Sequence, residues 1–294
     1  MSREYIVHKP VELDATLAKF RKKFPTVADL KHYWLQKKYD GCFGVAVLLD
    51  DGTQRMLSRT NEDYTPSCKH ILRELREALE VAGQDSGVFL GEVWHPDYTF
   101  PVISGKFRKN APSNLAFVAN DFLSVEDFQA GHCDEPYKSR HQFLLDVLPE
   151  VEGGYVSTAV TLYQWTGHPH DYAMQWKAEG GFDGAIMRDP DGTWCAGAGK
   201  TGEIIKVKPV ESLDLLCIGF DVQPGPKTGR PVLTLVVSYK GKPVGVGSGV
   251  PHSMKAADVV GKIVEVEAMG ESTEGALREP RFKGIRQDKL QPDA

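Results

Sequence analysis

The secondary structure that the sequence predicts changes in character at residues 209–212, and this change constrains the fold more than any other feature. On the C-terminal side, the sequence contains only short apolar strands separated by glycine-containing turns. These strands are predicted at 213–220, 232–239, 242–250 and 262–268. Short strands at this spacing, in roughly eighty residues, predict a small closed β-barrel such as an OB-fold. The Pro-Val-Glu-Ser sequence before them has the composition of a hinge.

On the N-terminal side, strands and helices alternate. The clearest helix covers 69–82, where an apolar face is followed by Gly83 in C-cap position. Helical spacing also occurs at 16–24 and 172–178. Strands are predicted at 45–49, 54–60, 86–94, 115–123, 185–188 and 204–208. Such alternation is typical of a mixed α+β domain.

Size and composition restrict the class of protein. A chain of 294 residues with 41% hydrophobic content can bury two medium cores, so we expect two domains, 1–209 and 210–294. The start lacks an apolar run of signal-peptide length, and no stretch approaches the ~18 apolar residues that span a bilayer, which predicts a soluble cytoplasmic protein. Five scattered cysteines without a Cys-x-x-Cys pair argue against a disulfide framework or a zinc ribbon. A net charge of -5 means that any DNA site must be a local concentration of cations.

The sequence Lys38-Tyr39-Asp40-Gly41 is the candidate catalytic motif, and Lys38 is the candidate nucleophile. A lysine ammonium cannot attack an electrophile, so Lys38 needs a lowered pKa, from a neighbouring cation such as Lys37, a bound metal or partial desolvation. The alternative is an ordinary charged turn, which chance would give in roughly one chain of this length in fifteen. Other motifs must therefore decide.

Charged residues also occur inside the predicted strands. Glu92 and Asp121 each lie in an apolar strand, where a carboxylate is costly unless it has a partner. Lys206 and Lys208 alternate along one strand and therefore share a face. The alternative for these two lysines is a solvated strand edge. The polar segment 124–151 between these strands is interpreted as helical scaffold.

In their order and spacing, these residues resemble the ATP-dependent DNA ligases, and in particular the small two-domain ligases of phages. The matching stretches are Lys38-Tyr39-Asp40-Gly41, Ser58-Arg59, Gly91-Glu92, Asp121, residues 183–188, Lys206-Val207-Lys208 and Arg286-Gln287-Asp288-Lys289. The resemblance covers nearly the whole chain. It implies a nucleotidyltransferase (adenylation) domain followed by an OB-fold that binds DNA.

The resemblance implies a three-step reaction that seals nicks in duplex DNA. Lys38 attacks the α-phosphorus of ATP, expels pyrophosphate and carries AMP; the AMP passes to the 5′-phosphate of the nick, and the 3′-hydroxyl then displaces it. Because charge develops on phosphoryl oxygens, the expected catalytic groups are Lys206, Lys208 and Mg²⁺. The implied partner is nicked double-stranded DNA, the expected state is a monomer, and a phage-encoded enzyme would act in the host cytoplasm.

The same resemblance assigns other residues to nucleotide, metal and DNA. Glu92 matches the carboxylate that holds the ribose, and Glu92 and Asp183 are the expected Mg²⁺ ligands, although the family usually has glutamate where Asp183 stands. Gln36 matches a residue that reads the adenine amino group, which an amide can do through its carbonyl oxygen. Further nucleotide contacts are expected from Arg59, Phe117, Arg286 and Lys289. DNA contacts are expected from Arg55, Arg59, Arg188 and Lys283.

The chain departs from the family pattern at two positions. Phe43 stands where an arginine usually meets phosphate, so Arg59 or Arg55 would have to serve alone. Asn120 stands where an aromatic ring usually stacks on adenine, so Phe117 or Phe122 would have to stack instead, unless the register is slipped.

Two alternatives remain beside the ligase. An mRNA guanylyltransferase shares the lysine motif and an OB-fold but closes with a different C-terminal motif. A catalytically inactive nick-binding protein would keep the fold, and the departures at Phe43 and Asn120 favour it, whereas the retention of Lys38, Glu92, Lys206 and Lys208 argues against it. Most RNA ligases lack such a C-terminal domain, and an NAD-dependent ligase would carry a cysteine cluster for zinc.

Overall fold

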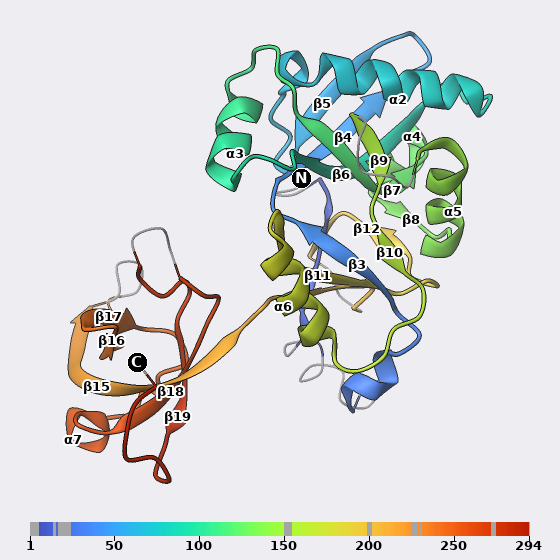
Figure 1. Ribbon diagram of the computed structural model, residues 1–294. Coiled ribbons are helices and arrows are strands. Elements are labelled where there is room, and N and C mark those ends of the chain that lie inside the picture. Colours follow the sequence, from blue (N-terminus) through green and yellow to red (C-terminus); the bar gives the residue numbers. More distant parts are fainter. Residues whose placement is uncertain are drawn as a thin grey trace. The chain divides into compact units, whose positions relative to one another are not determined.

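The computed structural model describes residues 6–13, 16, 25–149, 155–198, 202–224, 229, 231–271 and 275–293. The chain divides into two compact units, Met1–Lys208 and Pro209–Ala294 (Figure 1). Except for Thr16, the helix predicted at 16–24 lies outside the described residues. Within the described ranges, no helix has the length and apolar character required to cross a membrane.

Two five-stranded sheets form the framework of the first unit (Figure 1). The strands of one sheet, in spatial order, are β5 (Gln54–Ser58), β4 (Cys42–Leu48), β6 (Gly87–Trp94), β7 (Ala116–Leu123) and β9 (Val156–Thr158). The strands of the other are β10 (Thr161–Leu162), β3 (Trp34–Tyr39), β11 (Phe182–Arg188), β14 (Ile204–Val207) and β2 (Val11–Glu12). All neighbours are antiparallel except the pairs β7–β9 and β14–β2. Two smaller pairs join β1 (His8–Lys9) to β13 (Gly197–Ala198) and β8 (His132–Cys133) to β12 (Trp194–Cys195).

The helices of the first unit cover these sheets. The predicted helix is α2 (Lys69–Val81), which buries its apolar face, Ile71, Leu72, Leu75 and Leu79, as the periodicity requires. The helix predicted at 172–178 is α6 (Pro169–Glu179), which packs on β11. The remaining helices are α3 (Phe100–Arg108), α4 (Val125–Ala130) and α5 (Tyr137–Val147), with single 3₁₀ turns at Val27–Leu30 and Thr65–Ser67. The alternating pattern of the sequence therefore corresponds to an α+β unit.

The second unit is built around one antiparallel sheet. In spatial order its strands are β17 (Lys242–Val246), β16 (Pro231–Tyr239), β15 (Glu211–Pro224), β18 (Ile263–Ala268) and β19 (Arg281–Ile285), with the short helix α7 at Ala256–Val259. The described strands do not form a continuous closed barrel; a single bridge joins Ser248, after β17, to Arg281 of β19. The hinge prediction was wrong for Glu211 and Ser212, because both belong to β15 and pair with β18.

Candidate active site

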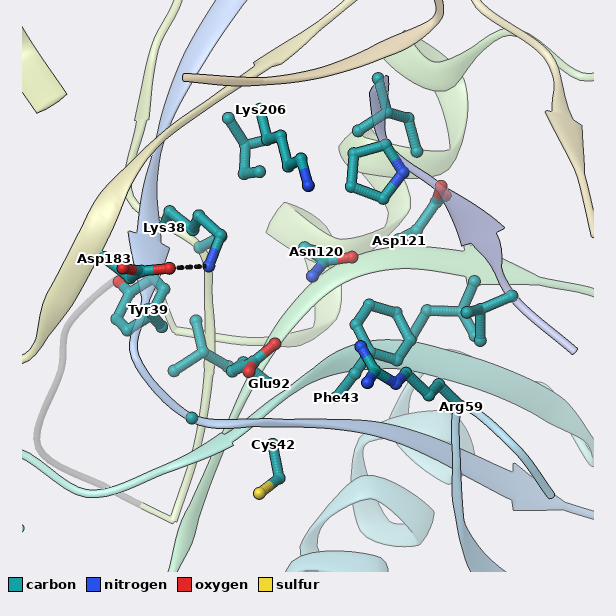
Figure 2. A pocket seen from close by; sticks show the side chains of 18 of the residues that line it. Lys38, Tyr39, Cys42, Phe43, Arg59, Glu92, Asn120, Asp121, Asp183 and Lys206 are labelled. Carbon is teal, nitrogen blue, oxygen red and sulfur yellow. Dashed lines mark hydrogen bonds and ion pairs between the residues drawn. The ribbon is translucent and has the colours of Figure 1, made fainter. Parts of the chain in front are cut away.

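A cavity of about 610 Å³ lies in the first unit and is lined by residues of both sheets (Figure 2). β3 supplies Lys38 and Gln36, β6 supplies Glu92, and β11 supplies Asp183. Lys206 and Lys208 reach the cavity from β14 and the residue that follows it. The structure thus brings together in one cavity the residues that the sequence motifs selected from four separate strands.

The turn after Lys38 explains the glycine of the motif. A Cβ atom on Gly41 would lie 2.4 Å from the carbonyl oxygen of Val93 and 2.8 Å from Cγ of Glu92. Only glycine permits this approach, so the turn between β3 and β4 rests directly against β6. Lys38 and Glu92 are held on adjacent walls of the cavity as a result.

Lys38 is surrounded by carboxylates rather than by cations. Its Nζ donates to Oδ2 of Asp183 at 2.7 Å, whereas the Nζ of Lys37 pairs with Glu179 at 3.1 Å. Burial lowers the pKa of Lys38, but the charges of Asp183, Glu92 and Asp40 outweigh burial and raise it. The prediction that the surroundings lower this pKa was therefore wrong for the protein without ligand. Lys38 is an ammonium until its surroundings change.

The pKa of Glu92 is also raised, and for a carboxyl group this favours the neutral form. Burial, together with the charges of Asp40 and Asp183, raises its pKa to about 8 even though Lys38 and Arg59 favour the ionised form. At neutral pH the carboxyl group is therefore mostly protonated. A cation bound beside Glu92 and Asp183 would favour ionisation.

Glu92 and Asp183 can both supply oxygen donors for a metal in the cavity. No set of three or more His, Cys, Asp or Glu side chains in the described part of the chain is grouped to hold one. Mg²⁺ commonly takes one or two protein carboxylates and completes its shell with water and phosphate oxygens. Glu92 and Asp183 therefore suit a metal that arrives with a nucleotide better than a permanently bound ion.

Lys206 and Lys208 share a partner, which confirms that they share a face. Their Nζ atoms lie 3.3 and 3.9 Å from Oε1 of Glu12, which is opposite Lys206 in the β14–β2 pair. Both lysine side chains are partly buried, and the Glu12 side chain is 50% exposed. Two ammonium groups at one point of the wall form a site for an anion of the size of phosphate.

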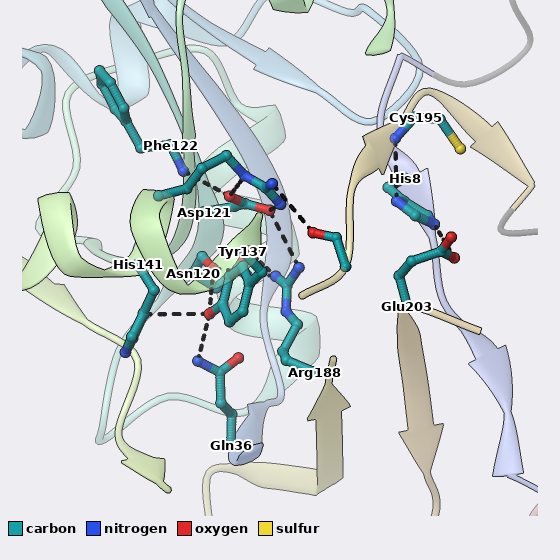
Figure 3. A network of polar contacts seen from close by, with 12 residues as sticks. His8, Gln36, Asn120, Asp121, Phe122, Tyr137, His141, Arg188, Cys195 and Glu203 are labelled. Atoms are coloured by element: carbon teal, nitrogen blue, oxygen red, sulfur yellow. Dashed lines mark hydrogen bonds and ion pairs between the residues drawn. The ribbon is translucent and has the colours of Figure 1, made fainter. Parts of the chain in front are cut away.

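A buried polar network adjoins the cavity (Figure 3). Asp121 accepts from Nε of Arg140 at 2.8 Å and from Nη1 of Arg188 at 3.3 Å, and Arg188 also donates to Oδ1 of Asn120 at 2.8 Å. Arg188 is only 5% exposed, so the structure places this predicted DNA contact in the interior instead. Because two guanidiniums surround the carboxylate, the pKa of Asp121 is lowered despite its burial.

The scaffold interpretation of 124–151 was incomplete. Arg140 and Tyr137, both on α5, are buried and bond to the cavity residues Asp121 and Gln36. Neither could be recognised from the sequence, because polar side chains on a helix usually face solvent.

The aromatic rings proposed for adenine stacking are placed elsewhere. Phe117 is fully buried in the core, and Phe122 stacks on Phe143 with ring centroids 4.1 Å apart. Neither ring is among the described residues that line the cavity, whereas Asn120 is. Phe117 therefore cannot contact the nucleotide without a rearrangement of the core.

Three arginines near the cavity differ in where their guanidiniums lie. Arg55 is turned outward and donates through Nε and Nη2 to Asp63, each at 3.0 Å. Arg59 lines the cavity, and so does Arg108 of α3, which the sequence reading missed. The position of Arg108 at the end of a helix with Lys106 and Lys109 gave only the signal of a basic helix terminus. Arg59 and Arg108 are the exposed guanidiniums on this side of the cavity.

The remaining predicted residues belong to the second unit. Arg286 and Lys289 both pair with the buried carboxylate of Asp214, Arg286 through Nη1 at 3.0 Å. Lys283 pairs with Glu267 at 2.8 Å.

Residues 15–208 match the family model described as the ATP dependent DNA ligase domain. The chain belongs to this family. A protein named DNA ligase from Natronomonas pharaonis is 26% identical over 305 residues, in a match that covers 88% of the present chain and 52% of the relative. The chain thus spans about half the length of that relative.

Solved structures share the fold of this ATP-dependent DNA ligase domain. The structure named "Pmar-Lig_Pre." has a TM-score of 0.70 at 19% sequence identity, and the match covers 98% of the present chain and 69% of that one. The ATP-dependent DNA ligase from bacteriophage T7, in complex with ATP, has a TM-score of 0.57 at 17% identity, and the match covers 95% of the present chain and 98% of that one. At these identities the similarity concerns the fold.

Proposed function

We propose that this protein is an ATP-dependent DNA ligase that seals nicks in duplex DNA through an AMP bound covalently to Lys38. The observation that carries the proposal is the gathering of Lys38, Glu92, Asp183 and Lys206 in one cavity of a chain that belongs to the ATP-dependent DNA ligase domain family. An ordinary charged turn or a solvated strand edge would have no reason to bring these residues together.

The nucleotide can be placed by the chemistry of the walls. Lys206 and Lys208 bind the α-phosphate and its neighbours, in exchange for their contact with Glu12. Glu92 lies where it can bond to the ribose, and Gln36, two residues before Lys38 on the same face of β3, meets the base. The reacting groups would then be aligned for in-line displacement of pyrophosphate.

Asp183 positions the nucleophile. Its 2.7 Å bond to Nζ of Lys38 fixes the direction of the amine and gives the departing proton an acceptor. Mg²⁺ held by Glu92 and Asp183 would supply positive charge to the phosphoryl oxygens. Once the carboxylate charges around Lys38 are neutralised, burial lowers its pKa and so favours the neutral amine.

We assign the second unit to DNA binding and interpret its sheet as an OB-fold. The five antiparallel strands, and the bridge from Ser248, two residues after β17, to Arg281 of β19, support this assignment, since an OB-fold is a partly open five-stranded barrel. Lys283 here, and Arg59 and Arg108 at the cavity of the first unit, are the cations assigned to DNA phosphates. Arg286 and Lys289 are assigned to the pyrophosphate leaving group.

The decisive experiment is incubation with ATP and Mg²⁺ followed by peptide mass spectrometry. One AMP should appear on the peptide that contains Lys38, because a phosphoramidate needs the amine at the phosphate site. Lys38→Ala should abolish the adduct and nick sealing, whereas Lys37→Ala should retain both. An adduct on Lys37 would overturn the assignment, and labelling from GTP but not ATP would favour an mRNA guanylyltransferase.

A further inference from the structure

The amide of Gln36 is held by two hydroxyl groups (Figure 3). Its Nε2 lies 2.9 Å from the hydroxyl oxygen of Tyr137 and 2.8 Å from Oγ1 of Thr161. Thr161 is directly opposite Gln36 in the β3–β10 pair, and Tyr137 approaches from α5. Gln36 is 1% exposed and Tyr137 is 2% exposed, so water does not compete freely for these bonds.

The polarity of both bonds is fixed by what the hydroxyl groups do next. Oγ1 of Thr161 donates to the carbonyl oxygen of Ala159 at 2.8 Å, and the hydroxyl of Tyr137 lies 3.0 Å from the carbonyl oxygen of Asn120. A carbonyl oxygen can only accept a hydrogen bond. Each hydroxyl group therefore donates its single proton to that carbonyl oxygen and must accept from Gln36. Burial raises the pKa of Tyr137 to about 12, so its hydroxyl keeps that proton.

His141 does not change this conclusion. Its Nδ1 lies 3.3 Å from the Tyr137 hydroxyl, and either atom can be the donor. If Tyr137 donated to His141 instead of Asn120, its oxygen would still accept from Gln36. A reversed amide would require both hydroxyl protons, and Ala159 would lose its bond from Thr161.

With both N–H groups of the Gln36 amide engaged, its carbonyl oxygen has no hydrogen-bond partner among the described residues. In Figure 3 the dashed contact of the Gln36 amide starts at its nitrogen and none starts at its oxygen, and Gln36 lines the cavity. An adenine amino group can donate to this oxygen. A 6-oxopurine presents a second acceptor at the same place, and two facing acceptors repel unless the amide reverses.

We propose that Tyr137 and Thr161 are positioning residues that set nucleotide specificity by locking the Gln36 amide as an acceptor for a 6-aminopurine. This inference rests on the proposed use of ATP by the same cavity. It adds two residues, 101 and 125 positions from Gln36 in the sequence, that touch neither phosphate nor DNA in the proposed mechanism.

ATP and ITP form the matched pair of probes, because they differ only at the 6-position of the base and the adjacent N1 proton. Dissociation constants for both are measured by calorimetry without divalent metal, for the wild-type protein, Thr161→Val, Tyr137→Phe and the double variant. The wild-type protein should prefer ATP. The preference should fall in each single variant and by at least roughly tenfold in the double variant, because the amide can then reverse to donate to the 6-oxo group.

Two controls separate positioning from general damage. Tyr163→Phe removes a hydroxyl of the same cluster that lies 3.2 Å from Nε2 of His141, and should leave the ATP to ITP ratio unchanged. Adding Gln36→Glu to the double variant should restore the preference for ATP, because an ionised carboxylate presents an acceptor in either orientation. If Tyr137→Phe fails to fold, Thr161→Val, which conserves volume, still carries the test.

The outcomes distinguish this inference from the function on which it rests. A wild-type protein that binds neither nucleotide and takes no AMP from ATP in the presence of Mg²⁺ would overturn the proposed ATP use, and the inference with it. Binding of ATP with an unchanged ATP to ITP ratio in the double variant would overturn the lock and leave the ligase proposal standing. A ratio that falls but is not restored by Gln36→Glu would also overturn the polarity argument, since loss of packing would explain it better.

Discussion

Glu92 should make the first unit less stable as the pH rises. Its pKa is raised from 4.5 to about 8 in the folded protein, so between these values the folded chain holds a proton that the unfolded chain releases. The free energy of unfolding then falls with rising pH by about 1.4 kcal/mol per unit. Relative to a variant without this group, stability is unchanged below about pH 4.5 and is fully reduced above about pH 8.

The isosteric variant Glu92→Gln removes the titration and keeps the shape. The pKa of Glu92 differs between the unfolded chain, 4.5, and the folded protein, about 8. At about 1.36 kcal/mol per pKa unit, this difference limits the gain in stability of the variant at high pH to ~5 kcal/mol. The measured gain should be smaller, because side chains and water relax around the new charge. The two proteins should be closest in stability near pH 5 and differ most near pH 8.5.

The assay is urea denaturation followed by tryptophan fluorescence at a series of pH values. All five tryptophans, at positions 34, 94, 165, 176 and 194, belong to the first unit, so the signal is specific for the unit that contains Glu92. Glu80→Gln is the matched control, since it makes the same charge change at an exposed position of α2. Parallel pH profiles for wild type and Glu92→Gln from pH 5 to 8.5 would refute the reasoning and show that Glu92 ionises without penalty.

Two further predictions concern DNA and the second unit. Binding of nicked duplex should weaken steeply between about 50 and 200 mM salt in a filter-binding or anisotropy titration. Lys283→Ala should lower the slope of the log–log plot of affinity against salt by about one. An affinity that does not change with salt would exclude a groove of phosphate-binding cations. Arg286→Ala and Lys289→Ala should slow formation of the Lys38 adduct by orders of magnitude more than closure of a pre-adenylated nick, because pyrophosphate leaves only in the first step. Equal losses in the two single-turnover rates would mean that the pairs of Arg286 and Lys289 with Asp214 merely support the second unit.

The part of the site that the sequence predicted follows from local rules. Strand alternation placed Lys206 and Lys208 on one face, and both reach the same Glu12 oxygen. The glycine of the Lys-x-Asp-Gly motif required a turn, and the structure adds that the turn touches Glu92. These features depend on neighbours in the sequence or on the direction of a strand.

The part that the sequence did not predict depends on distant contacts. Tyr137 lies 101 residues from Gln36, and its role depends on the direction of α5 over the sheet, which no periodicity reveals. Arg188 looked like an exposed cation at a strand end, but Asp121 and Asn120 bind it in the interior. The sign of the pKa shift at Lys38 depends on three carboxylates, two of which, Asp183 and Glu92, come from other strands. The adjacent Lys37 had led us to expect a lowered pKa for Lys38, whereas the pKa is raised.

The proposed catalytic lysines are all paired with carboxylates at the wall of the cavity. Lys38 is bound to Asp183, and Lys206 and Lys208 are near Glu12, so each amine is already partly desolvated and directed into the cavity before a nucleotide enters. Phosphate oxygens that replace Glu12 exchange one anionic partner for another, which costs less reorganisation than ordering free lysine side chains. The charges of Asp183, Glu92 and Asp40 raise the pKa of Lys38 and so favour its protonated form, which is not a nucleophile. In the proposed mechanism, activation of Lys38 therefore requires neutralisation of the Asp183 charge beside it. A lysine prepared in this way reacts only when the substrate has completed the site.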